Sequence, residues 1–275
     1  MYEILDKQIL SDTVKLMKIK APLVAKHALA GQFIILRIDE EGERIPLTIA
    51  DYDRKKGTIT IIFMEVGKTT KQLGKMKKGD FLLNFVGPLG VASEIEKYGT
   101  VVCIGGGVGI APLYPIIRAL KQAGNYVISI LGARNESLLM LEKEIGEFSD
   151  ELHIATDDGS KGTKGFVTTV LQKLIDDGKT IDIVWAIGPV IMMKVVVDLT
   201  KKYDLKTIVS LNPIMVDGTG MCGGCRVSVG GETKFACVDG PEFNGHLVDF
   251  DNLMLRNRRF LREEEKSCKM LKGVE

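Results

Sequence analysis

The chain has 275 residues, of which 45% are hydrophobic and 27% are charged, and its formal net charge is +1. This length accommodates two domains of ordinary size or three small ones, with the composition of a globular protein. The near-zero charge and the lack of a long basic run argue against nucleic acid as the main partner. No apolar stretch of about 18 residues predicts a membrane span, and the N-terminus has no signal-peptide pattern, so we expect a cytoplasmic protein without a membrane partner.

The first region, residues 1–95, has the pattern of short strands separated by turn residues. One short helix is also predicted, near 69–76. Closely spaced strands with turn signals between them are typical of an antiparallel barrel or sandwich. The predicted strands are 2–10, 13–19, 33–38, 45–50, 58–66 and 81–86.

Two segments of this region have residue types suited to binding a ligand. Thr48 places a short hydroxyl on a strand, where it can hydrogen-bond a polar ring edge. Gly67 to Thr70 would open the short helix, and a helix N-terminus favours phosphate. Plain barrel strands and a turn remain the alternative for both segments.

The second region, residues 96–211, alternates strands with helices. That alternation predicts a parallel sheet with helices on both faces. The predicted strands are 100–105, 126–131, 151–156, 181–187 and 206–211. The predicted helices are 110–123, 137–147, 165–177 and 190–203.

A glycine-rich turn, Gly105 to Pro112, follows the first strand of this region and opens its first helix. Glycines there let the backbone approach a pyrophosphate, which a helix N-terminus attracts. The usual G-x-G-x-x-G fingerprint is not met, because position 110 is Ile, and Gly132-Ala133-Arg134 offers no acidic residue after the second strand. A tight strand–helix turn without a ligand is the alternative.

Two further strand ends should face the same crevice, because ligands of open α/β sheets bind at the carboxyl ends of strands. Gly188-Pro189 ends the fourth strand and opens a helix that includes Met192. Thr156, Asp157 and Asp158 end the third strand, where a simple polar turn is the alternative.

The third region, residues 212–250, contains the spacing D-x4-C-x2-C-x11-C, formed by Asp217, Cys222, Cys225 and Cys237. Plant-type [2Fe–2S] centres use C-x4-C-x2-C and a distant fourth Cys, and an Asp in the first position still supplies an anionic ligand. A structural zinc site is the alternative, and Asp239 competes with Asp217 for the ligand place. A hairpin is predicted from 226–229 and 233–237, and residues 251–275 are predicted to form a short, charged, partly helical tail.

The order of these motifs resembles the ferredoxin–NADP reductase superfamily. The resemblance is closer to the electron-transfer subunits of dihydroorotate dehydrogenase and of NADH-dependent reduced ferredoxin:NADP oxidoreductase, the latter also called sulfide dehydrogenase. It extends from Tyr2 to about Asp251. It implies an antiparallel β-barrel that binds FAD (1–95), an α/β parallel-sheet domain that binds NAD(P) (96–211), a small [2Fe–2S] module (212–250) and a C-terminal tail (251–275).

The resemblance also implies the residues of each site, with Thr48 beside flavin N5. The FAD residues would be Arg44, Pro46, Leu47, Thr48, Ile62, Phe63, Met64, Gly67, Thr69 and Thr70. The NAD(P) residues would be Gly106, Gly107, Val108, Gly109, Thr156, Asp157, Asp158, Gly188, Pro189 and Met192. The cluster ligands would be Asp217, Cys222, Cys225 and Cys237, and the Asp favours the ferredoxin:NADP oxidoreductase branch.

These cofactors imply a path for electrons. A nicotinamide transfers two electrons as hydride and an iron–sulfur centre transfers one, so a flavin must stand between them. We therefore expect an oxidoreductase subunit and a larger flavin and iron–sulfur partner docked near 212–250, through which ferredoxin could exchange electrons in a bifurcating complex. The alternatives are the dihydroorotate dehydrogenase subunit, an NADPH-linked sulfide dehydrogenase subunit and a zinc-stabilised regulatory module. NAD versus NADP stays open, although Arg134 could favour a 2′-phosphate.

Overall fold

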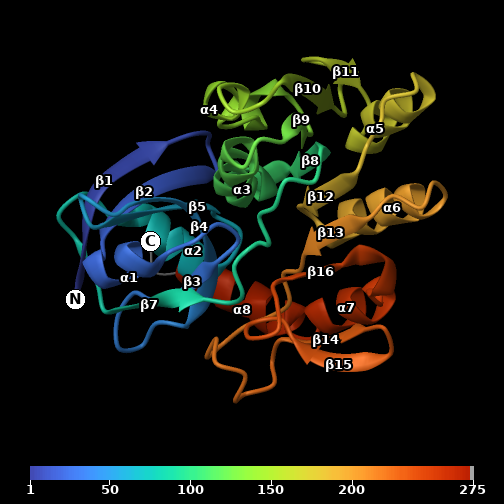
Figure 1. Ribbon diagram of the computed structural model, residues 1–275. Coiled ribbons are helices and arrows are strands. Elements are labelled where there is room, and N and C mark those ends of the chain that lie inside the picture. Colours follow the sequence, from blue (N-terminus) through green and yellow to red (C-terminus); the bar gives the residue numbers. More distant parts are fainter. Residues whose placement is uncertain (273–275) are drawn as a thin grey trace.

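The computed structural model describes residues 1–272, and Figure 1 shows a barrel, an α/β layer and a C-terminal module arranged around one another. The barrel is one antiparallel sheet with the strand order β6-β1-β2-β5-β4-β3-β7. Its two end strands, β6 and β7, are separated in the chain by a single residue, so the sheet curls until it nearly closes. The barrel elements are β1 (Tyr2–Ile9), β2 (Val14–Lys20), α1 (Pro22–His27), β3 (Phe33–Arg37), β4 (Ile45–Asp53), β5 (Thr58–Met64), α2 (Lys68–Lys75), β6 (Phe81–Leu82) and β7 (Asn84–Leu89).

Strand β5 shows why this barrel is not free-standing. Ile59, Ile61 and Phe63 point into the barrel interior, as alternation along a strand requires. Ile62 lies on the other face and is also buried, because it packs against the next domain together with Ile110 of helix α3 (Ile110–Gln122). A continuous apolar run therefore marks a strand buried on both faces.

The second domain is a sheet with the order β11-β10-β9-β8-β12-β13-β16, parallel except for β16 (Glu242–Asn244). The chain starts at the central strand β8, builds outward on one side through β9 to β11, then crosses to β12 on the other. The remaining elements are β8 (Thr100–Gly106), β9 (Tyr126–Ala133), α4 (Glu142–Gly146), β10 (Glu151–Thr156), β11 (Thr163–Lys164), α5 (Val167–Asp176), β12 (Ile183–Ile187), α6 (Val190–Lys201) and β13 (Thr207–Ser210). The switch between β8 and β12 is where such sheets bind ligands.

One predicted helix of this domain is wrong in extent. The helix expected over 137–147 is confined to Glu142–Gly146, preceded by a 3-10 turn at Glu136–Leu138. Leu141 has φ 54°, a left-handed conformation that interrupts a helix. Met140 beside it is buried, so the chain bends to place this apolar side chain in the core.

The C-terminal part is joined to both other regions. Its hairpin, β14 (Arg226–Val229) with β15 (Glu232–Phe235), ends two residues earlier than predicted. There the N–H groups of Val238 and Asp239 donate to the carbonyl of Phe235 and close a turn. Strand β16 (Glu242–Asn244) then leaves the hairpin and pairs with β13. The tail forms two helices, α7 (Phe250–Asn257) and α8 (Leu261–Lys272).

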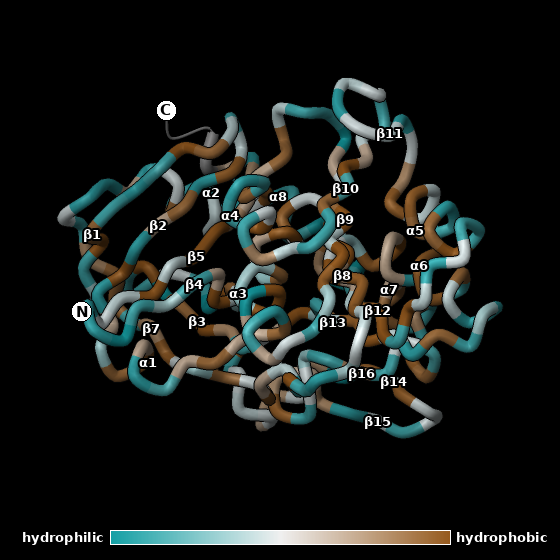
Figure 2. Tube along the Cα trace, turned by 45° about the horizontal axis from the view of Figure 1, so that its top comes forward, coloured by the Kyte–Doolittle hydropathy of each residue, from teal (hydrophilic) through white to brown (hydrophobic). Residues whose placement is uncertain are grey.

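One cluster of buried apolar side chains includes residues from all three parts. Figure 2 shows that hydrophobic segments, in brown, run along the strands at the centre of the molecule. Cys225 and Val227 of the module share a cluster with Val209 of the sheet and with Phe33 of the barrel. In the described residues 1–272, no helix is long and apolar enough to cross a membrane.

Candidate functional site

Two turns at the carboxyl ends of β8 and β12 interlock, and their glycines are required by that contact. A Cβ on Gly109 would lie 2.4 Å from the carbonyl oxygen of Ile187 and 2.6 Å from the Cα of Gly188. A Cβ on Gly106 would lie 2.2 Å from the sulfur of Met192. Gly109 therefore owes its identity first to the packing of one turn on the other, because backbone atoms cannot move aside, whereas Gly106 meets the flexible side chain of Met192.

Gly107 differs from its neighbours. Its φ is +55°, and a Cβ built on it would meet no atom within 4 Å, so its face is open. It starts the 3-10 turn Gly107–Gly109 that leads directly into α3. An open glycine at the start of a 13-residue helix is a backbone cradle that fits the pyrophosphate of a dinucleotide.

The end of β10 lies beside the end of β9, at the same edge of the sheet. The N–H of Asp157 donates to the carbonyl of Ala133 at 3.1 Å. The Thr156 hydroxyl accepts the N–H of Lys161 at 3.0 Å and donates to its carbonyl at 2.8 Å, so it shapes the turn. Asp157, Asp158 and Arg134 are exposed at this edge, where a nucleotide could meet either charge.

Among the predicted flavin residues, the barrel places only some side chains toward the nucleotide domain. Ile62 and Met64 pack on the side of α3. Thr48 alternates with Leu47 and Ile49, which belong to the barrel core, so Thr48 lies on the outer face. The side chain of Phe63, by contrast, is enclosed in the barrel, and Leu47 packs against the barrel core. These two residues could therefore meet a flavin only through their backbones.

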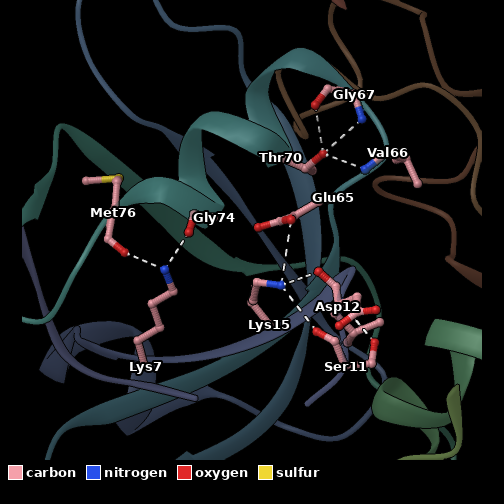
Figure 3. Close-up of polar contacts among 11 residues, drawn as sticks. Lys7, Ser11, Asp12, Lys15, Glu65, Val66, Gly67, Thr70, Gly74 and Met76 are labelled. Carbon is pink, nitrogen blue, oxygen red and sulfur yellow. Dashed lines mark hydrogen bonds and ion pairs between the residues drawn. The ribbon is translucent and has the colours of Figure 1, made fainter. Parts of the chain in front are cut away.

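Helix α2 is held at its start by a hydroxyl, which Figure 3 shows. The Thr70 hydroxyl accepts the N–H groups of Val66 and Gly67, both at 3.0 Å. The hydroxyl of Thr69 is buried and donates to the carboxylate of Glu43 at 2.5 Å. Since both hydroxyls have protein partners, a phosphate at this turn would be bound by backbone N–H groups of the first helical turn.

The far end of α2 is held as firmly. The Lys7 ammonium donates to the carbonyls of Gly74 and Met76, the latter at 2.9 Å (Figure 3). A cation at a helix C-terminus pairs with unsatisfied carbonyls and with the negative end of the dipole. Arg44, by contrast, is exposed on the chain before β4.

The cysteine region brings the sulfurs of Cys225 and Cys237 together, whereas the Asp217 carboxylate contacts the backbone of Cys222. The sulfurs of Cys225 and Cys237 are 3.2 Å apart, and both side chains are buried. Burial raises the pKa of Cys237 to about 12, so a thiolate there requires a positive partner such as a metal. The Asp217 carboxylate accepts the N–H of Thr219 at 2.8 Å and that of Cys222 at 2.7 Å, and the bond from Thr219 contributes most to holding its pKa below the ordinary range.

In residues 1–272 no group of three or more His, Cys, Asp or Glu side chains gathers around one point, so the four predicted ligands do not form a closed set in this structure. Their chemistry suits a [2Fe–2S] centre, which has two irons with two anionic protein ligands each. The Asp239 carboxylate accepts the N–H of Phe235 at 2.6 Å and so belongs to the turn after the hairpin.

Two features escaped the sequence reasoning. Glu242 of β16 is half-buried where all three parts meet, and its carboxylate accepts from the Ser93 hydroxyl at 2.6 Å and the Trp185 ring N–H at 3.2 Å. The extent of helix in the tail was predicted too short. Asp249 was the available signal, because its carboxylate accepts the N–H of Asn252 at 2.9 Å and so caps the start of α7.

Comparison with known proteins now identifies the family. Residues 212–249 match the iron–sulfur cluster binding domain of dihydroorotate dehydrogenase B, and residues 103–198 match the oxidoreductase NAD-binding domain. The chain is 52% identical over 264 residues to the Thermotoga maritima dihydroorotate dehydrogenase B (NAD(+)) electron transfer subunit homolog, covering 96% of this chain and 93% of that one. The chain belongs to the family of dihydroorotate dehydrogenase B electron-transfer subunits.

Two further likenesses bear on the branch of this family. The electron transfer subunit of Fusobacterium nucleatum dihydroorotate dehydrogenase B is 34% identical over 253 residues, covering 89% of this chain and 95% of that one. A solved structure of the NADH-dependent reduced ferredoxin-NADP oxidoreductase, reported for its insights into flavin-based electron bifurcation, has a 48% identical chain. It superimposes with a TM-score of 0.95, covering 100% of this chain and 98% of that one.

These findings confirm the predicted fold and oxidoreductase class. The protein is an iron–sulfur flavoprotein of the ferredoxin reductase type, with FAD, a [2Fe–2S] cluster and a nicotinamide nucleotide as its cofactors. Its relatives are subunits of larger enzymes, which implies a partner subunit. The assignment of individual residues to each cofactor stays a prediction.

Proposed function

We propose that this chain is the NAD(H)-side electron-transfer subunit of an NADH-dependent reduced ferredoxin:NADP oxidoreductase that bifurcates electrons in the cytoplasm. The main support is the 48% identical chain of that enzyme, which matches from end to end with a TM-score of 0.95. The partner would be a larger flavin and iron–sulfur subunit, and ferredoxin would exchange electrons with that partner.

The chain's own contribution is to position three groups and keep water from them. The open face of Gly107 and the start of α3 would hold the nucleotide, while the first turn of α2 would hold the flavin phosphates. Bound flavin converts between the two-electron chemistry of nicotinamide and the one-electron chemistry of the cluster. Thr48, on the outer face of β4, would orient the flavin ring from the side that faces the nucleotide domain.

The cluster ligands would be Asp217, Cys222, Cys225 and Cys237. Both oxygens of Asp217 already accept backbone N–H groups, but each carboxylate oxygen has a second lone pair that can bind iron. The same bonds keep the carboxylate ionised, which a ligand requires.

A second candidate function is the electron-transfer subunit of dihydroorotate dehydrogenase B itself. The matched iron–sulfur domain and the 34% identical Fusobacterium subunit favour it. The two functions differ in the partner and in the electron acceptor of the complex.

Purification of the native complex tests this choice. We expect flavin bands with broad iron–sulfur absorption, a larger flavoprotein partner, and NADP reduction by NADH that depends on reduced ferredoxin. Reduction of NADP without any dependence on ferredoxin would contradict the proposal. A partner that oxidises dihydroorotate would establish the second candidate instead.

The role of Asp217 has a separate test in the purified complex. Asp217→Cys should keep the cluster with an altered potential, whereas Asp217→Ala should lose or destabilise it, as measured by iron content and the electron paramagnetic resonance (EPR) spectrum of the reduced protein. An unchanged spectrum in the Ala variant would remove Asp217 from the ligand set.

A further inference from the structure

The C-terminal tail delivers two arginines to the loop between the central cysteines. The guanidinium groups of Arg256 and Arg259 both donate to the carbonyl of Gly224, at 3.4 Å and 3.1 Å. Gly224 lies between Cys222 and Cys225, and its own N–H approaches the sulfur of Cys222 at 3.4 Å. One glycine thus receives both arginines on its carbonyl and faces a ligand sulfur with its N–H.

These arginines bring positive charge that no carboxylate neutralises. Across residues 1–272, neither Arg256 nor Arg259 forms an ion pair, and Arg226, directly after Cys225, forms none either. The Nε of Arg256 is buried without a hydrogen-bond partner. Partial burial and the charges of Arg259 and Arg226 hold the pKa of Arg256 below its usual value.

Three like charges around one loop repel one another, so they favour an anion between them. A [2Fe–2S] centre with four anionic ligands is such an anion, because its net charge is negative and becomes more negative on reduction. Reduction potentials of these centres depend on nearby charge and on hydrogen bonds around the sulfurs. Cations beside the loop therefore stabilise the reduced cluster more than the oxidised one.

We propose that Arg256 and Arg259 are positioning residues of the cluster, which fix the Cys222–Cys225 loop through Gly224 and raise the reduction potential by their charge. This inference rests on the ligand set proposed above. The two arginines lie outside residues 212–249, the part that matches the family's iron–sulfur domain, so the tail extends the cluster site beyond that domain.

The test uses the native complex with Arg256→Gln, Arg259→Gln and the double variant. Arg258→Gln is the matched control, because it removes an equal charge from an exposed neighbouring side chain that makes no hydrogen bond to the loop in the described residues. Redox titration followed by the EPR signal of the reduced cluster gives the midpoint potential, and iron content gives occupancy. Iron retention during exposure to a chelator measures how firmly the loop holds the cluster.

We expect the double variant to be harder to reduce by about tenfold in the equilibrium constant, the size of effect expected from a charge near a partly buried site. For one electron this is about 59 mV toward more negative potential. Each single variant should shift less than the double, and Arg258→Gln should shift least. Unchanged potentials in a fully loaded double variant would overturn the proposal.

Lysine variants keep the test decisive if the glutamine variants lose the cluster. Arg256→Lys with Arg259→Lys keeps both charges, so it should retain iron and a potential near that of the wild type. Loss of iron from the lysine variant as well would show that the arginines act only on loop architecture and would overturn the electrostatic part. A wild-type complex without iron would instead refute the proposed function itself.

Discussion

The turns after β8 and β12 pack against each other through their backbones. The loop from 217 to 225 is held in a different way, because side chains bind its backbone. Gly109 rests on Ile187 and Gly188 with no room for a Cβ. The loop from 217 to 225 is instead held by the Asp217 carboxylate and, from outside, by arginines of the tail. The first site should be formed before any ligand arrives, while the second concentrates charge that an incoming cluster would neutralise.

Glu242 connects these two regions, because β16 carries it from the module into the nucleotide sheet. Its carboxylate accepts a hydrogen bond from Trp185 of β12, inside that sheet. We therefore expect a substitution in the packed turns to lower the stability of the whole fold and one at Glu242 to weaken both cofactor sites. A substitution in the cysteine loop should affect that loop alone.

The largest effect should come from Gly109→Ala. Its methyl group would overlap backbone atoms that cannot rotate away, so we expect about 2–3 kcal/mol lower free energy of unfolding and loss of nucleotide binding. Urea unfolding and NADH titration measure the two effects. Gly146→Ala is the matched control, since its Cβ would meet only Leu152 at 3.5 Å. Equal stability of both variants would refute the interlocked turns.

The next effect should come from Glu242→Ala. It leaves the Ser93 hydroxyl and the Trp185 ring N–H without their acceptor, at a cost of about 2 kcal/mol. Because the residue joins both regions, iron retention and nucleotide affinity should fall together, as measured by chelator challenge and NADH titration. A loss confined to one of the two would break the predicted connection.

A smaller, local effect is expected from Asp217→Asn. An amide has one acceptor oxygen, so one of the two N–H groups, of Thr219 or Cys222, loses its partner at about 1 kcal/mol. Hydrogen exchange of these amides should become faster, while NADH affinity stays unchanged. Slower release of iron than in the wild type would contradict the role of this carboxylate in the loop.

The smallest effect is the pH dependence of stability assigned to Glu242. Burial raises the pKa of its carboxyl above 4.5, so the folded state holds the proton more tightly than the unfolded chain. The contribution of Glu242 to the free energy of unfolding is fully present below the pKa of this carboxyl in the unfolded chain. It declines as the pH rises through the pKa of the carboxyl in the folded protein. Glu242→Gln should therefore lose stability less steeply above pH 4.5 than the wild type, in urea titrations across a pH series.

Glu151 provides the opposite sign as a control. A hydrogen bond from Lys179, chiefly, lowers the pKa of Glu151 to about 2, so its contribution is present above 4.5 and is lost as pH falls toward 2. Glu151→Gln should therefore reduce the loss of stability between pH 4.5 and pH 2. It should leave the dependence of stability on pH above 4.5 unchanged. If Glu242→Gln and Glu151→Gln change the stability in the same pH range, one of the two pKa shifts has been assigned to the wrong residue.

Local patterns were enough to predict much of this molecule. Alternation in 1–95 and the strand–helix succession in 96–211 set the two main domains, because strand and helix periods are written in neighbouring residues. The helix at 137–147 was predicted too long. The left-handed conformation of Leu141 follows from the burial of Met140 in the core, which local helix propensity does not reveal. The hairpin was predicted too long, because its last residues turn to bring Cys237 against Cys225.

By itself the sequence determined the ligand types, the glycine-rich turns and the order of the cofactor sites, since these depend on residue chemistry and spacing along the chain. Only the tertiary structure decided which glycines are needed for packing and which one is open, that Glu242 joins the parts through hydrogen bonds, and that Arg256 and Arg259 reach Gly224. Such contacts join residues tens of positions apart, and no local pattern encodes which distant side chains will share one carbonyl or one cavity.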